Sequence, residues 1–390
     1  MYDFDEIIPR RGSGAVKWDA RPPFRDCPDD FIPLWVADMD FKAAPFIIDA
    51  LRKRVEHGVF GYVSVPDSYY EATVRWFSRR HGWTMEKDWI IYTTGVVPAI
   101  SAVVKALSGP GEKVILQSPV YNCFFSSVRN NGCEILDVPL QYNGGVYGFD
   151  YEGLERACAD PKARVMLLCN PHNPAGRVWT REELARVGAI ARRHGVAVVS
   201  DEIRCEIVMP GYHYTPFASV SPEDQANCIT LCSPSKSFNI AGLQTANIVT
   251  PNEEWRALID RAININEICD INPFGVVALQ AAYSEEGDGW LEELNQYIYD
   301  NYLMLKEKLS DWPVCKLEGT YLPWVDVSSL GIPSGKIEEI LLRDHRVWVN
   351  AGSMYGTEGF IRINIATPRS VLAEGLGRVA CGLAALAHKD

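Results

Sequence analysis

Lys236 stands at residues 233–242, SPSKSFNIAG, among small hydroxyl and apolar residues. Because burial disfavours the charged form of an amine, a lysine held among such neighbours loses part of its proton affinity. A neutral amine can attack a carbonyl and form an imine. Ser233 and Ser235 precede the lysine and could donate hydrogen bonds to a phosphate on the same turn. The segment predicts an imine-forming lysine beside a phosphate site, with an ordinary polar loop as the alternative.

Two further turns offer groups for a flat, phosphorylated ligand. In open α/β sheets, ligands bind beyond the carboxyl ends of the strands, so the turns after predicted strands are the places to search. Gly95, Val96 and Val97 open a helix whose backbone N–H groups could hold a phosphate, although a plain strand-to-helix turn has the same pattern. Tyr121 follows the next predicted strand, where its ring could stack on a planar cofactor or belong to the core.

Polar side chains from three other segments complete the candidate site. Asn173 stands in the loop at residues 170–176, NPHNPAG, whose prolines fix the backbone. Asp201 ends a predicted strand, where a buried carboxylate needs a charged partner such as a protonated pyridine nitrogen, unless it caps the next helix. Arg362 alternates with apolar residues of a half-buried strand. A guanidinium suits a substrate carboxylate, although surface arginines on strands are common.

The composition excludes several classes of protein. The chain has 390 residues, 47% hydrophobic and 23% charged, which is enough for a large core and two domains. A net charge of −12 without a basic run argues against nucleic acid as a partner. The eleven cysteines show no metal-ligand spacing, so we predict no metal and free thiols in a reducing compartment. The N-terminus does not resemble a signal peptide, and no apolar run approaches about 18 residues, so we predict a cytoplasmic protein with no membrane association.

Between residues 46 and 286, short apolar runs alternate with helical patterns, which predicts an α/β fold with a mostly parallel sheet. The predicted strands lie at residues 89–93, 113–117, 134–138, 165–169, 197–200, 228–232 and 246–249. A long amphipathic helix at 291–309 then leads to segments at 314–327, 347–350 and 360–365 and a final helix from Ser370. We predict a large domain at residues 46–286 and a smaller α+β domain at 287–390, with residues 1–45 packing on the smaller domain or covering the site.

The candidate residues follow one another along the chain in the order Gly95-Val96-Val97, Tyr121, Asn173, Asp201, Lys236 and Arg362. This order resembles the fold-type I enzymes that depend on pyridoxal 5′-phosphate (PLP), the aspartate aminotransferase superfamily, across nearly the whole chain. The strings FIPLWVADMDF at residues 31–41 and KSFNIAG at 236–242 resemble the MalY/PatB group of cystathionine β-lyases and cysteine-S-conjugate β-lyases. The resemblance implies a three-layer PLP-dependent transferase fold and PLP as the cofactor.

The resemblance also implies a role for each candidate residue. Lys236 would form the internal aldimine, and Asp201 would pair with the pyridine N–H of the cofactor. The cofactor ring would stack on Tyr121, and its 3-oxygen would be bound by Asn173. Its phosphate would be bound by Gly95, Val96, Val97, Ser233 and Ser235. The amino-acid substrate would be bound by Arg362, Asn173 and Ala37. Tyr62 would reach the phosphate from a second subunit, so the resemblance implies a homodimer with shared active sites.

Two positions depart from the superfamily. Many aminotransferases have a tyrosine at the position of Arg204, and the lyase group often has a histidine; Arg204 therefore favours the lyases, and we count it among the cofactor-binding residues. The usual phosphate-binding arginine is replaced by Gln244. The charge of the phosphate would then be balanced by the helix dipole and by hydroxyl groups.

The resemblance to the MalY/PatB group implies a PLP-dependent carbon–sulfur β-lyase that cleaves L-cystathionine or a related S-substituted L-cysteine to a thiol, pyruvate and ammonia. One alternative is an aminotransferase, which shares the early steps and then protonates the cofactor instead of expelling a thiolate. Another alternative is a PLP-fold protein whose role is regulatory binding. The WVADMDF string and Arg204 favour the lyase over the aminotransferase.

Overall fold

The computed structural model describes residues 2–267 and 270–388 of the chain. Its centre is a seven-stranded sheet of order β2-β10-β9-β8-β7-β3-β4, in which β10 alone runs antiparallel to its two neighbours. The strands are β2 (Ile90–Thr93), β3 (Lys113–Leu116), β4 (Glu134–Asp137), β7 (Ala163–Cys169), β8 (Ala197–Asp201), β9 (Cys228–Cys232) and β10 (Ala246–Val249). All seven predicted strands are confirmed, with ends that shift by two residues or fewer.

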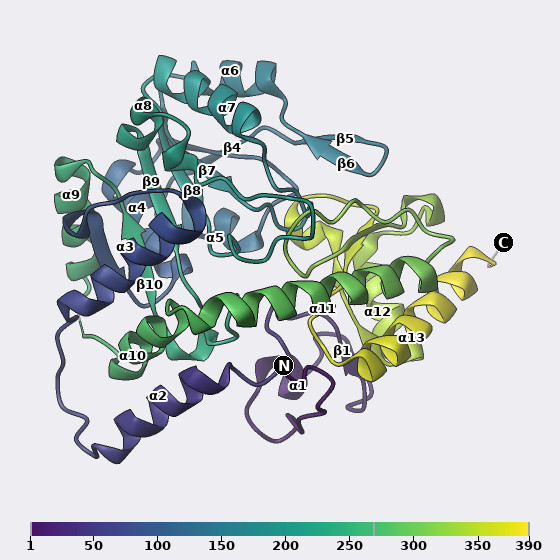
Figure 1. Ribbon diagram of the computed structural model, residues 1–390. Helices are drawn as coiled ribbons and strands as arrows, with labels where there is room; N and C mark the ends of the chain where they lie inside the picture. Colours follow the sequence, from purple (N-terminus) through teal and green to yellow (C-terminus); the bar gives the residue numbers. More distant parts are fainter. Residues whose placement is uncertain (1, 268–269, 389–390) are drawn as a thin grey trace.

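Helices cover both faces of this sheet, which gives three layers (Figure 1). Alternate residues of a strand point to opposite faces: Val114 and Leu116 enter the core beneath one helix layer, whereas Ile115 enters the core of the other. The first layer contains α4 (Val96–Leu107), α5 (Asn122–Asn130) and α9 (Glu253–Asn264). The second contains α3 (Asp67–His81), α6 (Tyr151–Cys158), α7 (Arg181–Arg193) and α10 (Pro273–Ala282), with the short α8 (Pro222–Ala226) beside α7. The predicted three-layer α/β fold is thereby confirmed.

The C-terminal part of the chain forms a smaller α+β unit. Its three-stranded sheet has the order β11-β14-β13, with helices α12 and α13 packed together beside it. Its elements are β11 (Trp324–Asp326), α12 (Ser334–His345), β12 (Val347–Trp348), β13 (Asn350–Ala351), β14 (Phe360–Arg362) and α13 (Arg369–Ala387). Within the segment at 314–327, only residues 324–326 form a strand, and Val314 adds an isolated bridge.

A long helix, α11 (Glu286–Lys308), runs from one unit to the other (Figure 1). Near its start, Gly287 approaches Trp76 and Phe238 of the larger unit so closely that a Cβ there would lie 3.1 to 3.2 Å from their rings. Further along, Asn301 Nδ2 donates to the backbone oxygens of Ile365 and Thr367 in the smaller unit. The domain boundary near residue 286 stays a prediction, since this single helix packs on both sides of it.

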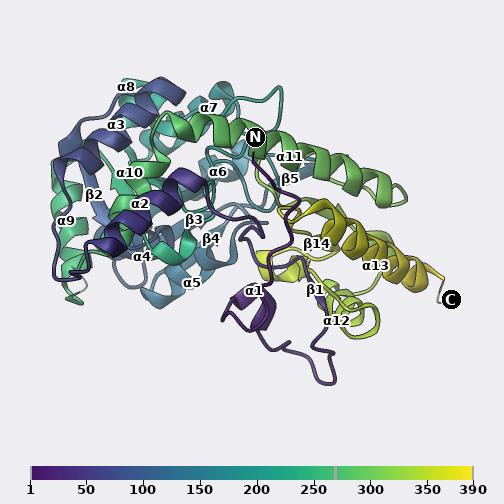
Figure 2. The same cartoon turned by 60° about the horizontal axis from the view of Figure 1, so that its bottom comes forward.

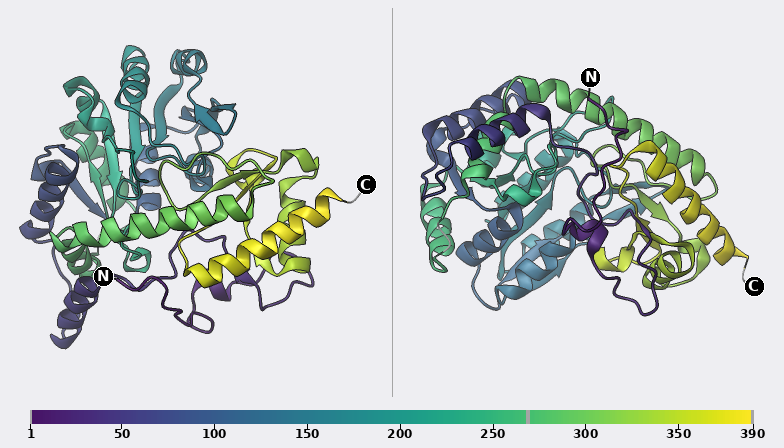
Figure 3. Two further views of the ribbon diagram at one scale, coloured as in Figure 1. Left: turned by 45° about the vertical axis from the view of Figure 1, so that its right-hand side comes forward. Right: turned by 90° about the horizontal axis from the view of Figure 1, so that it is seen from below.

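The N-terminal segment lies between the two units (Figure 3). It contains α1 (Val16–Asp19), β1 (Ile32–Pro33) and, at its end, α2 (Pro45–Glu56). Strand β1 pairs in parallel with β12, so this segment joins the smaller unit, and Figure 2 shows β1 near α12. A hairpin of β5 (Gln141–Asn143) and β6 (Val146–Gly148) projects from the larger unit.

By length and composition alone, helix α13 could span a membrane, since it has 19 residues and an 18-residue stretch of it reaches a mean hydropathy of 1.4. Because Glu374 and Arg378 interrupt it, α13 is not the unbroken apolar run that the sequence interpretation excluded. The apolar side chains of α13 have partners in the fold: Leu372, Leu376, Val379 and Leu383 are fully buried, and the helix packs on α11 and α12. This is the environment of a core helix.

Candidate active site

A cavity of about 220 Å³ opens at the carboxyl ends of the central strands. It brings together most of the residues that the sequence singled out, from turns that are far apart along the chain. Its lining consists of Gly95, Val96, Val97, Pro98, Tyr121, Cys169, Asn173, Asp201, Ile203, Arg204, Ser235, Lys236 and Ala241. The cavity lies where ligands bind in open parallel sheets.

Lys236 follows β9 and is largely, but not fully, buried. Its Nζ donates a hydrogen bond to the backbone oxygen of Ala37 at 3.1 Å. Burial, with a further contribution from the nearby Arg204 charge, lowers the pKa of Lys236 to about 8, although Asp38 and Asp201 oppose this shift. The amine is therefore neutral in a far larger share of molecules near neutral pH than an exposed lysine would be, as imine formation requires.

Asp201 ends β8 on the floor of the same cavity. Burial raises the pKa of its carboxyl group to about 6, while the positive charges of Arg204 and Lys236 act in the opposite direction. Its Oδ1 accepts a hydrogen bond from the Ile203 backbone N–H at 3.1 Å, within a turn and not at the start of a helix. A cationic group in the cavity would keep this carboxylate ionised.

Arg362 is buried, which overturns the alternative of a surface arginine on a strand. Its Nη1 donates to Asn173 Oδ1 at 3.2 Å, and its Nη2 donates to the backbone oxygen of Trp35 at 2.8 Å. Its Nε has no hydrogen-bond partner, and its guanidinium lies 4.7 Å from the centre of the Tyr355 ring. A fixed guanidinium with an unpaired N–H is suited to a carboxylate ligand.

Arg204 lines the cavity and is only 4% exposed. Its Nη1 has no hydrogen-bond partner, and the guanidinium lies 5.2 Å from the centre of the Tyr321 ring. A buried, unpaired cationic group is costly unless an anion binds to it. Together with Lys236 and Arg362, it makes this region electropositive and suited to an anionic cofactor and substrate.

The end of the cavity formed by α4 offers donors to a phosphate. Gly95 is the N-cap of α4 and no side chain caps the helix, so backbone N–H groups remain directed at the cavity. Ser235 lines the cavity, whereas Ser233 does not. The Ser233 hydroxyl donates to the Thr245 oxygen at 2.7 Å and accepts from the Ser235 N–H at 3.1 Å, so it holds the turn in place.

Tyr62 and Gln244 do not line the cavity of their own chain. Tyr62 is 95% exposed in the connection between α2 and α3. Gln244 is exposed after the short turn that follows the lysine segment.

The sequence interpretation missed two buried tyrosines. The Tyr321 hydroxyl donates to the Ala37 oxygen at 2.9 Å, and the Tyr355 hydroxyl accepts from Asn350 Nδ2 at 2.9 Å. Neither follows a strand of the central sheet, so the search for turns at strand ends had no reason to select them.

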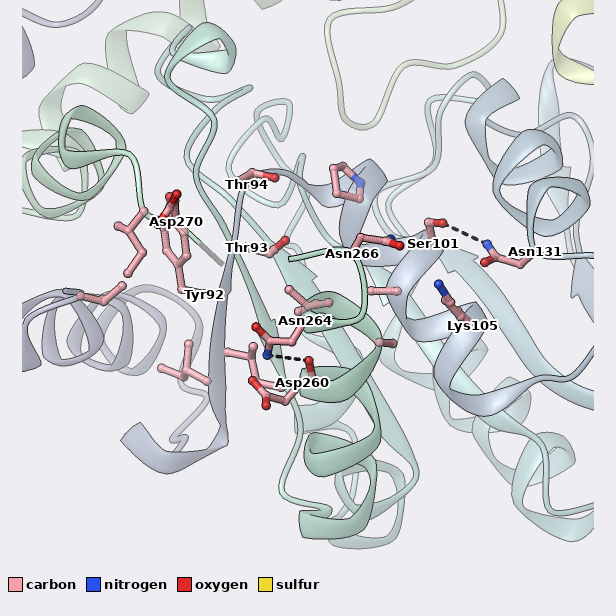
Figure 4. Close-up of a pocket in the computed structure, with 18 of the residues that line it drawn as sticks. Tyr92, Thr93, Thr94, Ser101, Lys105, Asn131, Asp260, Asn264, Asn266 and Asp270 are labelled. Carbon is pink, nitrogen blue, oxygen red and sulfur yellow. Dashed lines mark hydrogen bonds between the residues drawn. The ribbon is translucent and has the colours of Figure 1, made fainter. Parts of the chain in front are cut away.

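A larger cavity of about 720 Å³ lies along β2, α4 and α9 (Figure 4). Pro98 lines both cavities, so the two adjoin at the start of α4. Two side-chain amides on its walls already donate hydrogen bonds to neighbouring groups. Asn131 Nδ2 donates to Ser101 Oγ at 3.0 Å, and Asn264 Nδ2 donates to the Asp260 backbone oxygen at 2.8 Å.

One group of potential metal ligands occurs among the described residues, formed by His81, Cys205 and Glu206. The Glu206 carboxylate already accepts from His81 Nε2 at 2.8 Å, Trp76 Nε1 at 2.6 Å and Arg80 Nε at 2.9 Å. The adjacent Arg80 charge opposes a metal cation, so this group is an internal ion-pair cluster.

A three-layer α/β fold with a largely buried lysine, an aspartate and an arginine around one cavity defines the fold-type I class of PLP-dependent enzymes. The chain belongs to the aminotransferase class I and II family, whose model matches residues 29–379. It is 39% identical to cystathionine beta-lyase PatB of Bacillus subtilis, over 98% of this chain and all of the relative. It is 33% identical to protein MalY of Escherichia coli, over 96% of this chain and 97% of the relative.

Among solved structures, PLP-containing cystalysin from Treponema denticola is 34% identical and covers 99% of this chain and all of its own, with a TM-score of 0.94. The resemblance to the PatB/MalY group is thereby confirmed, and PLP is the cofactor of this family. The donors of the cavity fit such a group: an amine for its aldehyde, a carboxylate for its ring nitrogen, and helix N–H groups with a serine for its phosphate.

Proposed function

We propose that the protein is a PLP-dependent carbon–sulfur β-lyase acting on L-cystathionine or a related S-substituted L-cysteine. The observation that carries this proposal is Lys236, a largely buried lysine whose pKa is lowered to about 8 and which lines one cavity with Asp201 and Arg204. Similarity to PatB, whose name records cystathionine as a substrate, supports the choice of reaction.

The cavity residues divide the binding of the cofactor among them. Lys236 would attach it, Asp201 would hold its ring nitrogen in the protonated state, and Tyr121 would lie against its ring. Asn173 and Arg204 would bind its ring oxygen, and its phosphate would lie on Gly95, Val96, Val97 and Ser235, with Ser233 supporting the turn. When bound, PLP supplies the electron sink for the charge left on the substrate after loss of a proton.

The substrate carboxylate would bind the Arg362 guanidinium next to Asn173, with the Ala37 backbone alongside. The Lys236 amine would remove the Cα proton, for which it must be neutral. The Cβ–sulfur bond then breaks and the sulfur leaves as a thiolate that takes up a proton. The remaining three-carbon fragment consumes one water and yields pyruvate and ammonia.

We also propose a homodimer in which each site is completed by the partner. Exposed apolar residues gather on the connection that carries Tyr62, where Val59 and Phe60 are 62% and 56% exposed. The cavity in Figure 4 adjoins the catalytic cavity, and Leu258 and Ile265 on or beside α9 are also exposed. A second copy seated on this face would bury these side chains and bring its own Tyr62 towards the phosphate end.

Free thiols support the predicted reducing, cytoplasmic location: none of the ten cysteines within the described residues is paired.

The test is an assay of purified protein with L-cystathionine and with L-cystine, recording pyruvate, free thiol and the cofactor absorbance near 400–430 nm, a band of roughly that position being expected for a lysine-bound PLP. Equal amounts of pyruvate and thiol establish the lyase. Lys236→Ala should lose both the band and turnover, whereas Lys53→Ala, at an exposed position on α2, should keep both.

An aminotransferase is the second candidate, favoured by the family to which the chain belongs. In that case the cofactor absorbance would be bleached by an amino acid without release of thiol. Addition of a 2-oxo acid would then restore it.

A further inference from the structure

The segment at residues 35–41, WVADMDF, contacts the catalytic residues through its backbone. The Ala37 oxygen accepts hydrogen bonds from Lys236 Nζ at 3.1 Å and from the Tyr321 hydroxyl at 2.9 Å. The Trp35 oxygen accepts from Arg362 Nη2 at 2.8 Å. Main-chain carbonyls of one short segment therefore hold both the reactive lysine and the carboxylate-binding arginine.

The two aspartates of this segment, Asp38 and Asp40, form ion pairs with cationic residues of the chain before residue 31, which we call the N-terminal arm. We call this group, formed by Arg10, Lys17, Asp38 and Asp40, the arm cluster. Lys17 is fully buried, and its Nζ lies 2.7 Å from Asp40 Oδ2. Arg10 bonds both carboxylates, at 2.7 Å to Asp38 and 2.6 Å to Asp40. The cluster is charge-balanced, with two cations and two anions.

Asp40 has a further partner, since the indole Nε1 of Trp18 donates to its Oδ1 at 2.8 Å. Its own backbone N–H donates to the Ala366 oxygen at 3.0 Å. The burial of Asp40, to 5% exposure, prevents water from replacing these partners, so the carboxylate fixes the arm and the 35–41 segment relative to each other.

The same segment is tied to the turn that carries the lysine. Asn239, three positions after Lys236, accepts from the Met39 N–H at 3.0 Å and donates to the Met39 and Phe41 oxygens at 3.0 and 2.8 Å. The segment is thus bonded to the lysine turn on one side and to the arm cluster on the other. Only Asp38 and Met39 separate Asp40 from Ala37, so a shift of Asp40 is transmitted through a short length of backbone towards the Ala37 carbonyl.

We propose that Asp40 is a positioning residue, which places the Ala37 carbonyl and, through it, the Lys236 amine. The carbonyl takes one N–H of the amine, and this restricts the direction of the nitrogen lone pair that attacks a carbonyl or removes a proton. Misplacement of such a group slows a reaction more than it weakens binding. The inference rests on the role of Lys236 in the proposed function.

The central variant is Asp40→Asn, which keeps the size of the side chain and removes its charge. We expect kcat to fall by roughly ten- to a hundredfold, with little change in KM. The rate at which the PLP-free protein takes up PLP should fall as well, since that step uses the same amine and needs no turnover. The matched control is Glu6→Gln, which removes the carboxylate of an exposed ion pair of the same arm, Glu6 with Lys42, and should leave both rates unchanged.

A double variant separates positioning from stability. Asp40→Asn alone leaves the buried Lys17 charge with reduced compensation, which lowers Tm. In Lys17→Met with Asp40→Asn the charges are again balanced, so we expect Tm to recover while kcat and the rate of PLP uptake stay low. Trp18→Phe, which removes one hydrogen bond to Asp40, is the milder variant if the others do not fold, and it should show a smaller loss of the same kind.

Recovery of both kcat and Tm in the double variant would overturn the proposal, because the cluster would then be a stabilising feature only. The same conclusion would follow if Asp40→Asn or Trp18→Phe lowered Tm but kept the wild-type rates well below Tm. Should the protein prove to lack lyase activity, the rate of PLP uptake still tests the proposal, so the two failures can be distinguished.

Discussion

Arg362 Nη1 donates to Asn173 Oδ1 at 3.2 Å, although the two residues are 189 positions apart. The bond joins strand β14 of the smaller unit to the proline-rich loop after β7 of the larger one. It fixes the orientation of the guanidinium from one side, while the Trp35 oxygen fixes it from another. Arg362, the residue that we propose binds the substrate carboxylate, is therefore held at the junction of the two units by protein groups on two sides.

Replacement of Arg362 by lysine should raise KM strongly. Lysine keeps the charge but cannot bond Asn173, Trp35 and a carboxylate with one planar group. We expect kcat/KM to fall by about a hundredfold, roughly 3 kcal/mol, measured with the best thioether substrate. Arg378→Lys, at a half-buried position on α13 next to Glu374, is the control and should behave as wild type. An unchanged KM in Arg362→Lys would show that the carboxylate binds elsewhere.

The uptake of PLP by the PLP-free protein should depend on pH in a way set by Lys236. Only the neutral amine reacts, so the rate constant should rise with pH to a plateau, with a midpoint near pH 8, as the pKa of about 8 predicts, and well below the 10.5 of an ordinary lysine. Stopped-flow absorbance measures this midpoint. A midpoint near 10.5 would contradict the shifted pKa.

Arg204→Met should move that midpoint upwards, because the Arg204 charge is one cause of the lowered lysine pKa. Arg343→Met, at the surface of α12, carries the same change in net charge far from the cavity and should leave the midpoint in place. If both variants shift the midpoint equally, the effect comes from net charge and not from the local contact.

Hybrid dimers test the shared active site. Tyr62→Ala and Lys236→Ala should each be nearly inactive, the first through loss of a phosphate contact and the second through loss of the amine. Mixing the two after mild dissociation should restore part of the activity, because some hybrid sites combine the intact Lys236 of one chain with the intact Tyr62 of its partner. Mixtures that stay inactive, although light scattering shows dimers, would place Tyr62 outside the partner's site.

Because of Glu206, the free energy of unfolding should depend on pH under acidic conditions. Its partners His81 and Arg80 lower the pKa of this buried carboxyl to about 2 from the ordinary 4.5. The stabilisation is complete above about pH 4.5 and is lost as the pH falls through about 2, because protonation breaks these bonds. Glu206→Gln should lower the free energy of unfolding at neutral pH by on the order of 3 kcal/mol, and the difference should shrink towards pH 2.

Urea denaturation at several pH values measures this effect. Glu155→Gln is the matched control, since Glu155 also pairs with a histidine and an arginine, His194 and Arg193, but at the surface. It should change stability far less, because solvent screens the pair. Equal losses in the two variants would contradict a special role for burial at Glu206.

Local sequence patterns were sufficient to predict the central sheet. The runs at 228–232 and 246–249 coincide with β9 and β10, because apolar, β-branched strands buried on both faces have a pattern that can be read without knowledge of their neighbours. The turns after the parallel strands β7, β8 and β9 could be predicted to converge, since parallel strands place their carboxyl ends at one edge.

Contacts from outside the central sheet could not be predicted in this way. Nothing near Tyr321 in the sequence indicates that its hydroxyl shares the Ala37 oxygen with Lys236. The apolar composition of α13 does not reveal that its side chains face α11 and α12. Such contacts depend on how separate elements pack, and packing is decided by the shapes of all of them together.

The sequence by itself therefore predicted the positions of the central strands, the kinds of group at their ends and the lysine that we propose carries the chemistry. Only the tertiary structure decided that Ser233 does not line the cavity, that Arg204 keeps an unpaired N–H inside it, and that the charges at Asp38 and Asp40 face the N-terminal arm. The physical reason is that residue types and their spacing indicate which positions of an element are buried and which groups can donate or accept hydrogen bonds. The partner of each buried group is fixed only when distant segments pack and exclude water.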